Sequence, residues 1–404
     1  MPGISVLSDG KNLVRVFELL AGSYAGQIME KRGHRKQNIV LSAIFALSAV
    51  LNILAWNSTA FSDLHTKKVF PLWVRLYGGL TSRVPFSVGE WMLGAAVIWI
   101  ALAVVLVVVL LFLRRKRSFR KFVGGFFRLT AWITAVVVLI MTQNCFIQYH
   151  CTPIEKGLPG YGRDYSLEDL TKLRNMVVRR CNALSAQMER DENGELVYSP
   201  GQDAMKEEAR RCMRQLSENG WPQLGGFQVM PKALRASVFM SQQKMQGYYF
   251  PFSMEANFND IMEISNKPYT MCHELSHTHG YIYEDDANFL AFLACTQSED
   301  IFFQYSGWLG VLNYVDNDFW YSAGREYYFS QIHVLPRVRK DNQFLSEEVE
   351  AWIEKEAVLD SEVVEKAADT YVDTTLKVNG VKAGKLSYSN VVSLLLKYYA
   401  EPEN

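Results

Sequence analysis

The stretch Met271-Cys-His-Glu-Leu-Ser-His-Thr-His-Gly280, followed by Tyr281-Ile-Tyr-Glu-Asp-Asp-Ala-Asn-Phe289, carries the strongest structural signal in the chain. His273 and His277 stand four residues apart, so on a helix both imidazoles lie on one face and can bind one metal ion. Gly280 is suited to end this helix, because glycine adopts the left-handed conformation at no steric cost. The acids that follow suit the N-terminus of a second helix. The sequence therefore predicts two helices that meet at a metal site.

A catalytic zinc site needs a third protein ligand and one open position for water. We expect Zn2+ as the metal and Glu284 as the third ligand, with Asp286 as the alternative. Asn288 lies one turn after Glu284 and would orient a ligating histidine. Glu274 follows His273 directly, from where its carboxylate reaches a metal-bound water as a general base rather than the metal itself. The same pattern also fits a helix whose histidines only form hydrogen bonds.

The two segments resemble the motifs of gluzincin-type zinc peptidases, whose second motif reads Glu-x-x-Ala-Asp or Glu-x-x-Ala-Asn. The segment Glu284-Asp285-Asp286-Ala287-Asn288 matches this motif, although the gap after His277 is short for the type. His-Glu-x-x-His-x-x-Gly also begins the metzincin motif, but the third histidine of that motif would fall on Tyr283. Such sites usually have a second electrophile, for which three residues are candidates: His279, His333 and Tyr327.

Apolar residues are concentrated in the first 150 positions of the 404-residue chain, which indicates a membrane domain. Three stretches are long enough to cross about 30 Å of hydrocarbon at about 1.5 Å per residue. They run from about 38 to 56, from about 88 to 113 and from about 126 to 146. We therefore expect a membrane domain of three transmembrane helices over residues 38–146.

The distribution of basic residues predicts how the chain is oriented in the cell membrane. Residues 1–37 show no signal-peptide cleavage pattern and are expected to form a cytoplasmic segment. Basic residues cluster before the first span and at 114–121, and the positive-inside rule places these ends in the cytoplasm. Three spans then place residues 147–404 outside the cytoplasm. The expected protein is multi-pass, with an extracytoplasmic C-terminal domain.

The segment after the third span is long enough for one well-buried domain. Amphipathic patterns predict helices near 166–184 and 202–216. Residues 246–257 are rich in aromatics and contain Pro251, which confines a strand to the edge of a sheet. An edge strand just before the metal helix would bind a peptide by β-augmentation, or it is part of a structural hairpin. The expected fold is mainly α, with a mostly helical, zincin-like α+β domain and a small sheet.

Net charge and cysteine spacing bear on the expected partners, on disulfides and on the type of zinc site. The formal net charge is zero, so no global field favours nucleic acid as a partner. The six cysteines have irregular spacings that do not suggest a disulfide framework. Cys181 and Cys212 lie on two predicted outer helices and are a candidate pair, whereas Cys272 and Cys295 are expected to be buried thiols. No Cys-x-x-Cys occurs, so a thiolate zinc site is not expected.

The chain also resembles an uncharacterised family of bacterial multi-span membrane proteins with an extracytoplasmic His-Glu-x-x-His domain. The resemblance rests on these segments: 85–90, 249–252, 255–257, 272–277, 284–290, 305–307, 376–380 and 387–388. That family usually has Glu where this chain has Asp286, which keeps Glu284 and Asp286 both open as the third ligand. The resemblance implies a membrane-anchored peptidase but names no substrate.

The leading hypothesis is a zinc-dependent metallopeptidase that hydrolyses peptide bonds, with Glu274 as the general base. Its partners would be a peptide or protein substrate and the membrane, and its oligomeric state is not predicted. One alternative is a non-catalytic zinc- or peptide-binding membrane sensor that keeps the zincin fold, and another is a purely structural helix. The presence of Glu274 favours catalysis, because metal binding alone does not require it.

Overall fold

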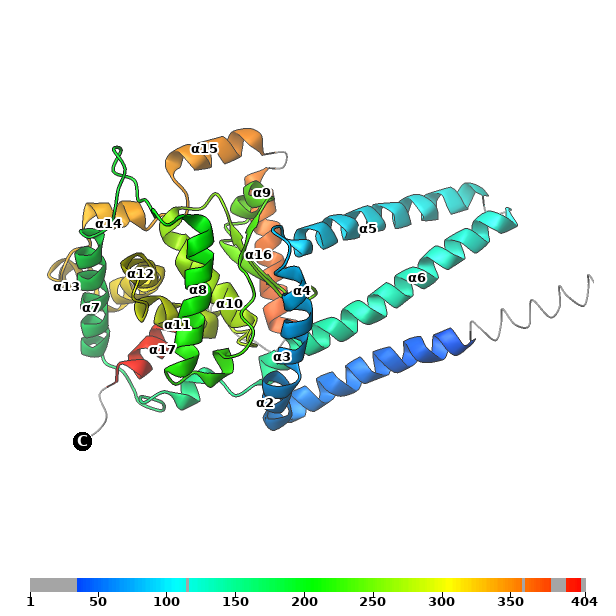
Figure 1. Cartoon of the computed structure of the whole chain (residues 1–404), viewed down its shortest axis with the longest axis horizontal. Helices are drawn as coiled ribbons and strands as arrows, with labels where there is room; N and C mark the ends of the chain where they lie inside the picture. Colours follow the sequence, from blue (N-terminus) through cyan, green and yellow to red (C-terminus); the bar gives the residue numbers. More distant parts are fainter. Residues whose placement is uncertain (1–34, 114–115, 358–359, 379–389, 401–404) are drawn as a thin grey trace, which may run out of the picture. The chain divides into compact units, whose positions relative to one another are not determined.

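The structure is a computed structural model that describes residues 35–113, 116–357, 360–378 and 390–400 (Figure 1). Most of the expected cytoplasmic segment, residues 1–37, lies outside the described residues. The chain divides into two units, the first formed by Met1–Leu51 and Leu106–Leu139, the second by Asn52–Val105 and Ile140–Asn404. The fold is mainly α with a small sheet, which confirms the predicted fold class.

Three helices of the described residues are long and apolar enough to cross a membrane: Arg35–Asn57, α5 (Val88–Leu113) and Arg117–His150. The last consists of α6 (Arg117–Met141), the π-helical turn η2 (Thr142–Phe146) and the 3-10 turn η3 (Ile147–His150). It begins before the expected position 126, because Arg and Lys are good helix formers and extend the helix beyond its apolar part. These helices indicate an integral membrane protein.

A column of short helices joins the first apolar helix to α5. Its parts are α2 (Thr59–Lys68), α3 (Phe70–Trp73), the π-helical turn η1 (Val74–Gly78) and α4 (Gly79–Thr81). Ser58 caps α2 by accepting a hydrogen bond from the Phe61 backbone N–H at 3.2 Å.

Most of the second unit is a helical domain. Its principal helices are α7 (Leu167–Ser185), α8 (Gly201–Glu218), α10 (Lys267–His277), α11 (Glu284–Thr296) and α12 (Ile301–Ala323). Shorter helices complete it: η4 (Ile154–Gly157), η5 (Pro222–Leu224), α9 (Ser237–Gln242), η6 (Ile264–Asn266), α13 (Arg325–Phe329), α14 (Pro336–Asp341), α15 (Glu347–Glu356), α16 (Ser361–Val378) and α17 (Asn390–Tyr398). A capping box of Ser166 and Asp169 starts α7.

The described part of the chain contains a three-stranded sheet with the order β1-β3-β2. The strands are β1 (Lys232–Leu234), β2 (Gly247–Phe250) and β3 (Glu255–Asn259). β3 is central, parallel to β1 and antiparallel to β2. The segment 246–257, expected to carry one edge strand, is a hairpin in which β2 is the edge. Pro251 lies in the turn, where its missing N–H breaks no ladder bond.

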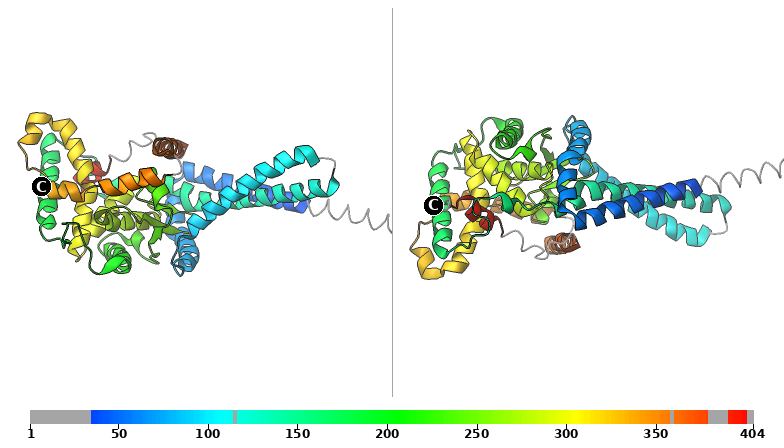
Figure 2. Two further views of the ribbon diagram at one scale, coloured as in Figure 1. Left: turned by 90° about the horizontal axis from the view of Figure 1, so that it is seen from above. Right: turned by 90° about the horizontal axis from the view of Figure 1, so that it is seen from below.

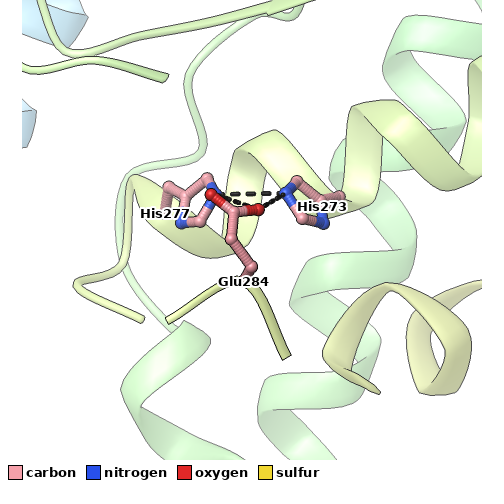
Figure 3. A group of neighbouring side chains, drawn as sticks. All are labelled: His273, His277 and Glu284. Atoms are coloured by element: carbon pink, nitrogen blue, oxygen red, sulfur yellow. Dashed lines mark hydrogen bonds and ion pairs between the residues drawn. The ribbon is translucent and has the colours of Figure 1, made fainter. Parts of the chain in front are cut away.

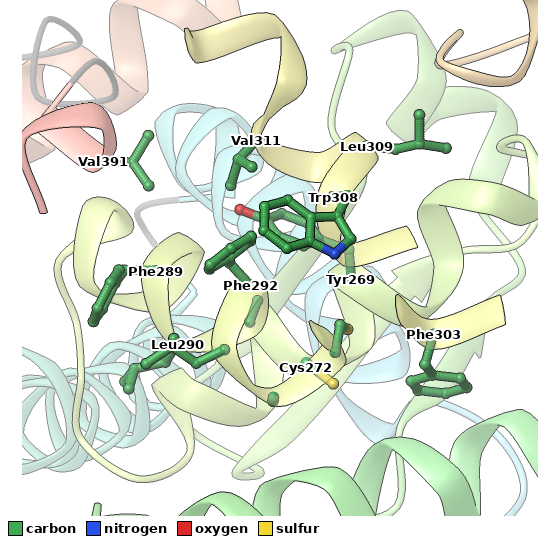
Figure 4. Close-up of a cluster of buried hydrophobic side chains, with 14 of the residues drawn as sticks. Tyr269, Cys272, Phe289, Leu290, Phe292, Phe303, Trp308, Leu309, Val311 and Val391 are labelled. Atoms are coloured by element: carbon green, nitrogen blue, oxygen red, sulfur yellow. The ribbon is translucent and has the colours of Figure 1, made fainter. Parts of the chain in front are cut away.

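The core of the second unit holds α10 and α11 in place (Figure 4). Met271, Cys272 and Leu275 of α10 are completely buried, as are several residues of α11. The Phe292 ring of α11 packs edge-on against Trp308 of α12, with 4.9 Å between centroids. Both helices of the predicted metal site are therefore fixed by close packing.

The cysteines of the described residues are all free thiols. The candidate pairing of Cys181 with Cys212 is therefore wrong. Both side chains are buried in the core, on α7 and α8 respectively, where they act as small apolar residues. Cys272 and Cys295 are buried thiols, as expected.

Candidate metal centre

The turn between α10 and α11 brings three potential ligands together. α10 ends at His277, and the chain then passes through Gly280 in the left-handed region, with φ of 88°. The Gly280 N–H donates to the His277 carbonyl at 3.0 Å and closes the turn. α11 then begins at Glu284, so its carboxylate returns to the histidines of α10.

His273, His277 and Glu284 converge on one point (Figure 3). The Nε2 atoms of His273 and His277 lie 3.1 Å apart. Glu284 Oε2 lies 3.0 Å from His273 Nε2 and 3.8 Å from His277 Nε2. Ligands about 2.0–2.1 Å from a tetrahedral zinc lie about 3.3 Å from one another. The observed spacings fit that geometry, and within the described ranges this is the one His/Cys/Asp/Glu group suited to an ion.

The outer nitrogen of each histidine is held by an oxygen atom. His277 Nδ1 lies 2.7 Å from the Tyr281 carbonyl oxygen, which only accepts, so the proton is on Nδ1. His273 Nδ1 lies 2.8 Å from Asn288 Oδ1, the residue expected to orient a ligand. If both rings were neutral, the two Nε2 lone pairs would face each other and the Glu284 carboxylate, with no proton or cation between them. A cation at their centre relieves this repulsion, so the donor set fits zinc.

The electrostatics of the cluster favour a positive charge. Burial by itself raises the pKa of Glu284, but hydrogen bonds from His273 and His277 hold it well below its usual range. Burial by itself lowers the pKa of His277, but the hydrogen bond and charge of Glu284 raise it to about 9. Glu284 therefore stays ionised, and a proton or a metal ion is needed to balance its charge.

Glu274 is buried beside this cluster but does not belong to it. Burial raises the pKa of Glu274 to about 7, although the neighbouring His273 and His277 oppose the rise. A Cβ on Gly247 of β2 would lie 2.6 Å from the Asn257 carbonyl oxygen and 2.7 Å from Glu274 Oε1, so only glycine fits here. Among the residues described, nothing hydrogen-bonds Glu274 Oε2. A buried carboxylate with a free oxygen and a pKa near neutral suits a proton acceptor.

Asp286, the alternative third ligand, lies away from the histidines. Burial, followed by the nearby charges of Asp285 and Glu155, raises the pKa of its carboxyl to about 8. The Ile154 backbone N–H donates a hydrogen bond to it. Asp286 thus faces η4, whereas Glu284 faces the cluster.

The three candidates for a second electrophile make other contacts. His279 Nδ1 lies 2.9 Å from the carbonyl oxygen of Leu275 in α10. The His333 ring packs against Phe329, and the Tyr327 ring packs against Phe319. None of these three belongs to the cluster found in the described part of the chain.

Two tyrosines that were not singled out from the sequence lie near the ligands. The ring of Tyr249, on β2, is centred 6.2 Å from the ring of His277. Tyr314 of α12 is half-buried, and burial followed by the charge of Glu284 raises its pKa to about 12, while a hydrogen bond with Asn288 opposes the rise. Tyr249 lies in the aromatic segment that drew attention, whereas no local pattern marks Tyr314.

The fold and the cluster define a class: an integral membrane protein with a mainly helical domain and a candidate metal site. The chain belongs to the family described as "Protein of unknown function (DUF3810)", whose profile matches residues 65–396. The match begins in α2 and ends in α17, so it includes α5, α6 and both helices of the cluster. No curated protein and no solved structure matches the chain.

Proposed function

We propose that this protein is a membrane-anchored zinc metallopeptidase that hydrolyses peptide bonds. One observation carries the proposal: two histidine Nε2 atoms and the Glu284 carboxylate converge beside the buried, partly unpaired carboxylate of Glu274. A structural metal site needs only ligands. A second buried acid next to the ligands, at a pKa near neutral, is what hydrolysis requires.

The residues of the chain have separable roles in this proposal. Zinc, when bound, would supply a Lewis acid that activates water and polarises a carbonyl group. Glu274 would accept the proton of the attacking water and pass it to the leaving amine. Asn288 and the Tyr281 carbonyl hold the two histidines in the orientation that points Nε2 inward.

The edge strand β2 is the proposed binding surface for an extended peptide. It is an edge of the sheet, and its first residue, Gly247, lies directly against Glu274. A peptide paired with β2 would have its backbone held by main-chain hydrogen bonds. The missing side chain at Gly247 leaves the Glu274 carboxylate room to approach the sheet edge.

We further propose that the domain lies outside the cytoplasm. The support is the basic residues Arg117, Arg120 and Lys121 at the start of α6, because such residues favour the cytoplasmic side. A topology reporter placed after Gln148 should then be extracytoplasmic, and one placed near Arg120 should be cytoplasmic. Finding both reporters on the same side would contradict this orientation.

The decisive experiment for the peptidase proposal is Glu274→Gln in the full-length protein purified in detergent. Zinc content is measured by mass spectrometry, and cleavage is measured on a peptide library. Turnover should fall by about 10²–10⁴-fold while zinc content stays the same, because Glu274 moves a proton but does not bind the metal. Glu192→Gln, at an exposed turn, is the matched control.

The outcomes separate the candidate functions. Equal cleavage by wild type and Glu274→Gln would contradict the assigned base. A wild-type protein that holds zinc but cleaves nothing would favour the zinc- or peptide-binding sensor instead.

A further inference from the structure

The helical column of residues 59–81 has two opposite faces. Apart from His65, its buried residues recur at every fourth position: Ser62, Thr66, Phe70, Val74 and Gly78. Four leucines, offset by two residues from that series, are 54–64% exposed: Leu64 60%, Leu72 64%, Leu76 54% and Leu80 57%. An offset of two residues is about 200° on a helix, so the leucines point away from the buried face. A row of exposed leucines needs an apolar partner.

The buried face of the column packs against the turn between α10 and α11 and against the segments next to the strands. A Cβ on Gly280 would lie 2.4 Å from Thr66 Cγ2, which shows how closely the turn after α10 approaches α2. A Cβ on Gly78 would lie 2.6 Å from Val229, which precedes β1. Thr81 Oγ1 donates to the Ser253 carbonyl at 3.1 Å. This face is fully used by the domain, and the leucine row is left for another partner.

The acidic and basic residues of the column also lie in different surroundings. Asp63, the acid in this stretch, accepts hydrogen bonds from the Thr152 N–H at 2.8 Å and the Thr152 hydroxyl at 2.7 Å. The basic residues of the stretch and its C-terminal flank are exposed: Lys67, Lys68, Arg75 and Arg83. The surface offered to a partner is therefore apolar with basic residues, which complements anionic lipid headgroups.

Both ends of the column continue into candidate membrane helices. It begins two residues after Asn57, the end of the first apolar helix, and α5 starts at Val88. The N-terminus of α5 is tied to the sheet, since Glu255 accepts from the Val88 N–H at 3.0 Å and the Gly89 N–H at 2.7 Å. The column runs across the direction of the first part of α5 (Figure 1, Figure 2). A helix crosswise to a spanning helix, at its end, lies along the membrane surface.

We infer that residues 59–81 form an interfacial membrane helix whose leucine row inserts into the headgroup–acyl boundary of the bilayer. The occupant of the leucine face is lipid, because one candidate membrane helix ends two residues before the column and another begins seven residues after it. The opposite face holds the turn at Gly280, so one helix, about 10 Å thick, separates that turn from the lipid. Membrane contact of this helix does not depend on whether the protein is a peptidase.

The test places a nitrobenzoxadiazole fluorophore on Leu72→Cys or Leu76→Cys in the full chain, reconstituted in phosphatidylcholine–phosphatidylglycerol vesicles. Doxyl-labelled lipid reports contact with the bilayer, and iodide reports contact with water. The labelled wild type corrects for native cysteines, of which Cys151 is half-buried. Tyr321→Cys on α12 is the matched control, since Tyr321 is an apolar side chain that is 85% exposed.

The Leu72 and Leu76 probes should lose most of their emission to doxyl lipid and keep it in iodide, and the Tyr321 probe should behave in the opposite way. Leucine-row probes that iodide quenches as strongly as the control would overturn the inference, because the face would be in water. Probes shielded from both quenchers would also overturn it, since another protein surface, such as a second copy, would then cover the row.

Discussion

Gly280→Ala tests the contact between the metal helix and the interfacial column, and its cost can be worked out from the structure. The left-handed conformation at φ of 88° costs an alanine about 1–2 kcal/mol. The new Cβ would also lie 2.4 Å from Thr66 Cγ2, well inside the roughly 3.5–4.0 Å of normal contact. Overpacking of this kind typically costs about 1–3 kcal/mol. We therefore expect a destabilisation of about 2–5 kcal/mol.

Two further variants separate the two contributions. Gly194→Ala has a similar φ of 79° but no atom within 4 Å of the new Cβ, so it should cost only the backbone strain. Thr66→Ser removes the clashing methyl group and keeps the hydroxyl, so Gly280→Ala with Thr66→Ser should recover the overpacking part. Stability is measured by thermal and denaturant unfolding of the full chain in detergent, with Thr66→Ser alone as reference. Equal losses for both alanine variants, or no recovery in the double variant, would refute the predicted contact.

The remaining predictions concern the ligands and pH. Glu284→Gln should weaken zinc binding by more than about 100-fold, because it removes the carboxylate that binds the metal. This loss exceeds the loss typical of changing a residue that only hydrogen-bonds a ligand. Asp286→Asn, two residues away, should leave the zinc affinity nearly unchanged. Isothermal titration with zinc compares the two variants. A larger loss of zinc affinity in Asp286→Asn than in Glu284→Gln would refute Glu284 as the ligand. Burial lowers the pKa of His65 from 6.5 to about 4, so the unfolded chain binds more protons between these values. The free energy of unfolding should therefore fall as pH drops from about 6.5 to 4. In His65→Gln this fall should be smaller by up to roughly 3 kcal/mol, as measured by unfolding at a series of pH values. An unchanged pH profile would show that His65 is not buried as a neutral ring.

Local patterns in the sequence were enough to predict several elements. The spacing of His273 and His277 places both on one helical face whatever packs around them. The amphipathic pattern of residues 166–184 predicted α7, and the apolar stretch of residues 88–113 predicted α5. A mainly α fold with three apolar helices follows from such patterns, because helix periodicity and membrane-spanning length are properties of neighbouring residues.

Sequence patterns gave wrong or incomplete predictions where the same local residues are compatible with two different structures. Basic residues from Arg117 onwards extend α6 beyond its apolar stretch, since hydropathy does not mark where a helix begins. Cys181 and Cys212 have plausible positions on two helices, but pairing depends on how those helices pack. The faces of 59–81 were not recognised either, because serine, threonine and glycine on the buried side give no apolar periodicity.

The sequence by itself determined the residue types of the candidate site and its helix–turn–helix frame. Only the tertiary structure decided that Glu284 faces the histidines while Asp286 faces η4, since both acids begin the same helix. It also decided that Gly247 lies against Glu274 and that Tyr249 lies over His277, contacts that join distant segments. The physical reason is that a helix register fixes which residues share a face, whereas the partner of that face is set by the packing of the whole domain.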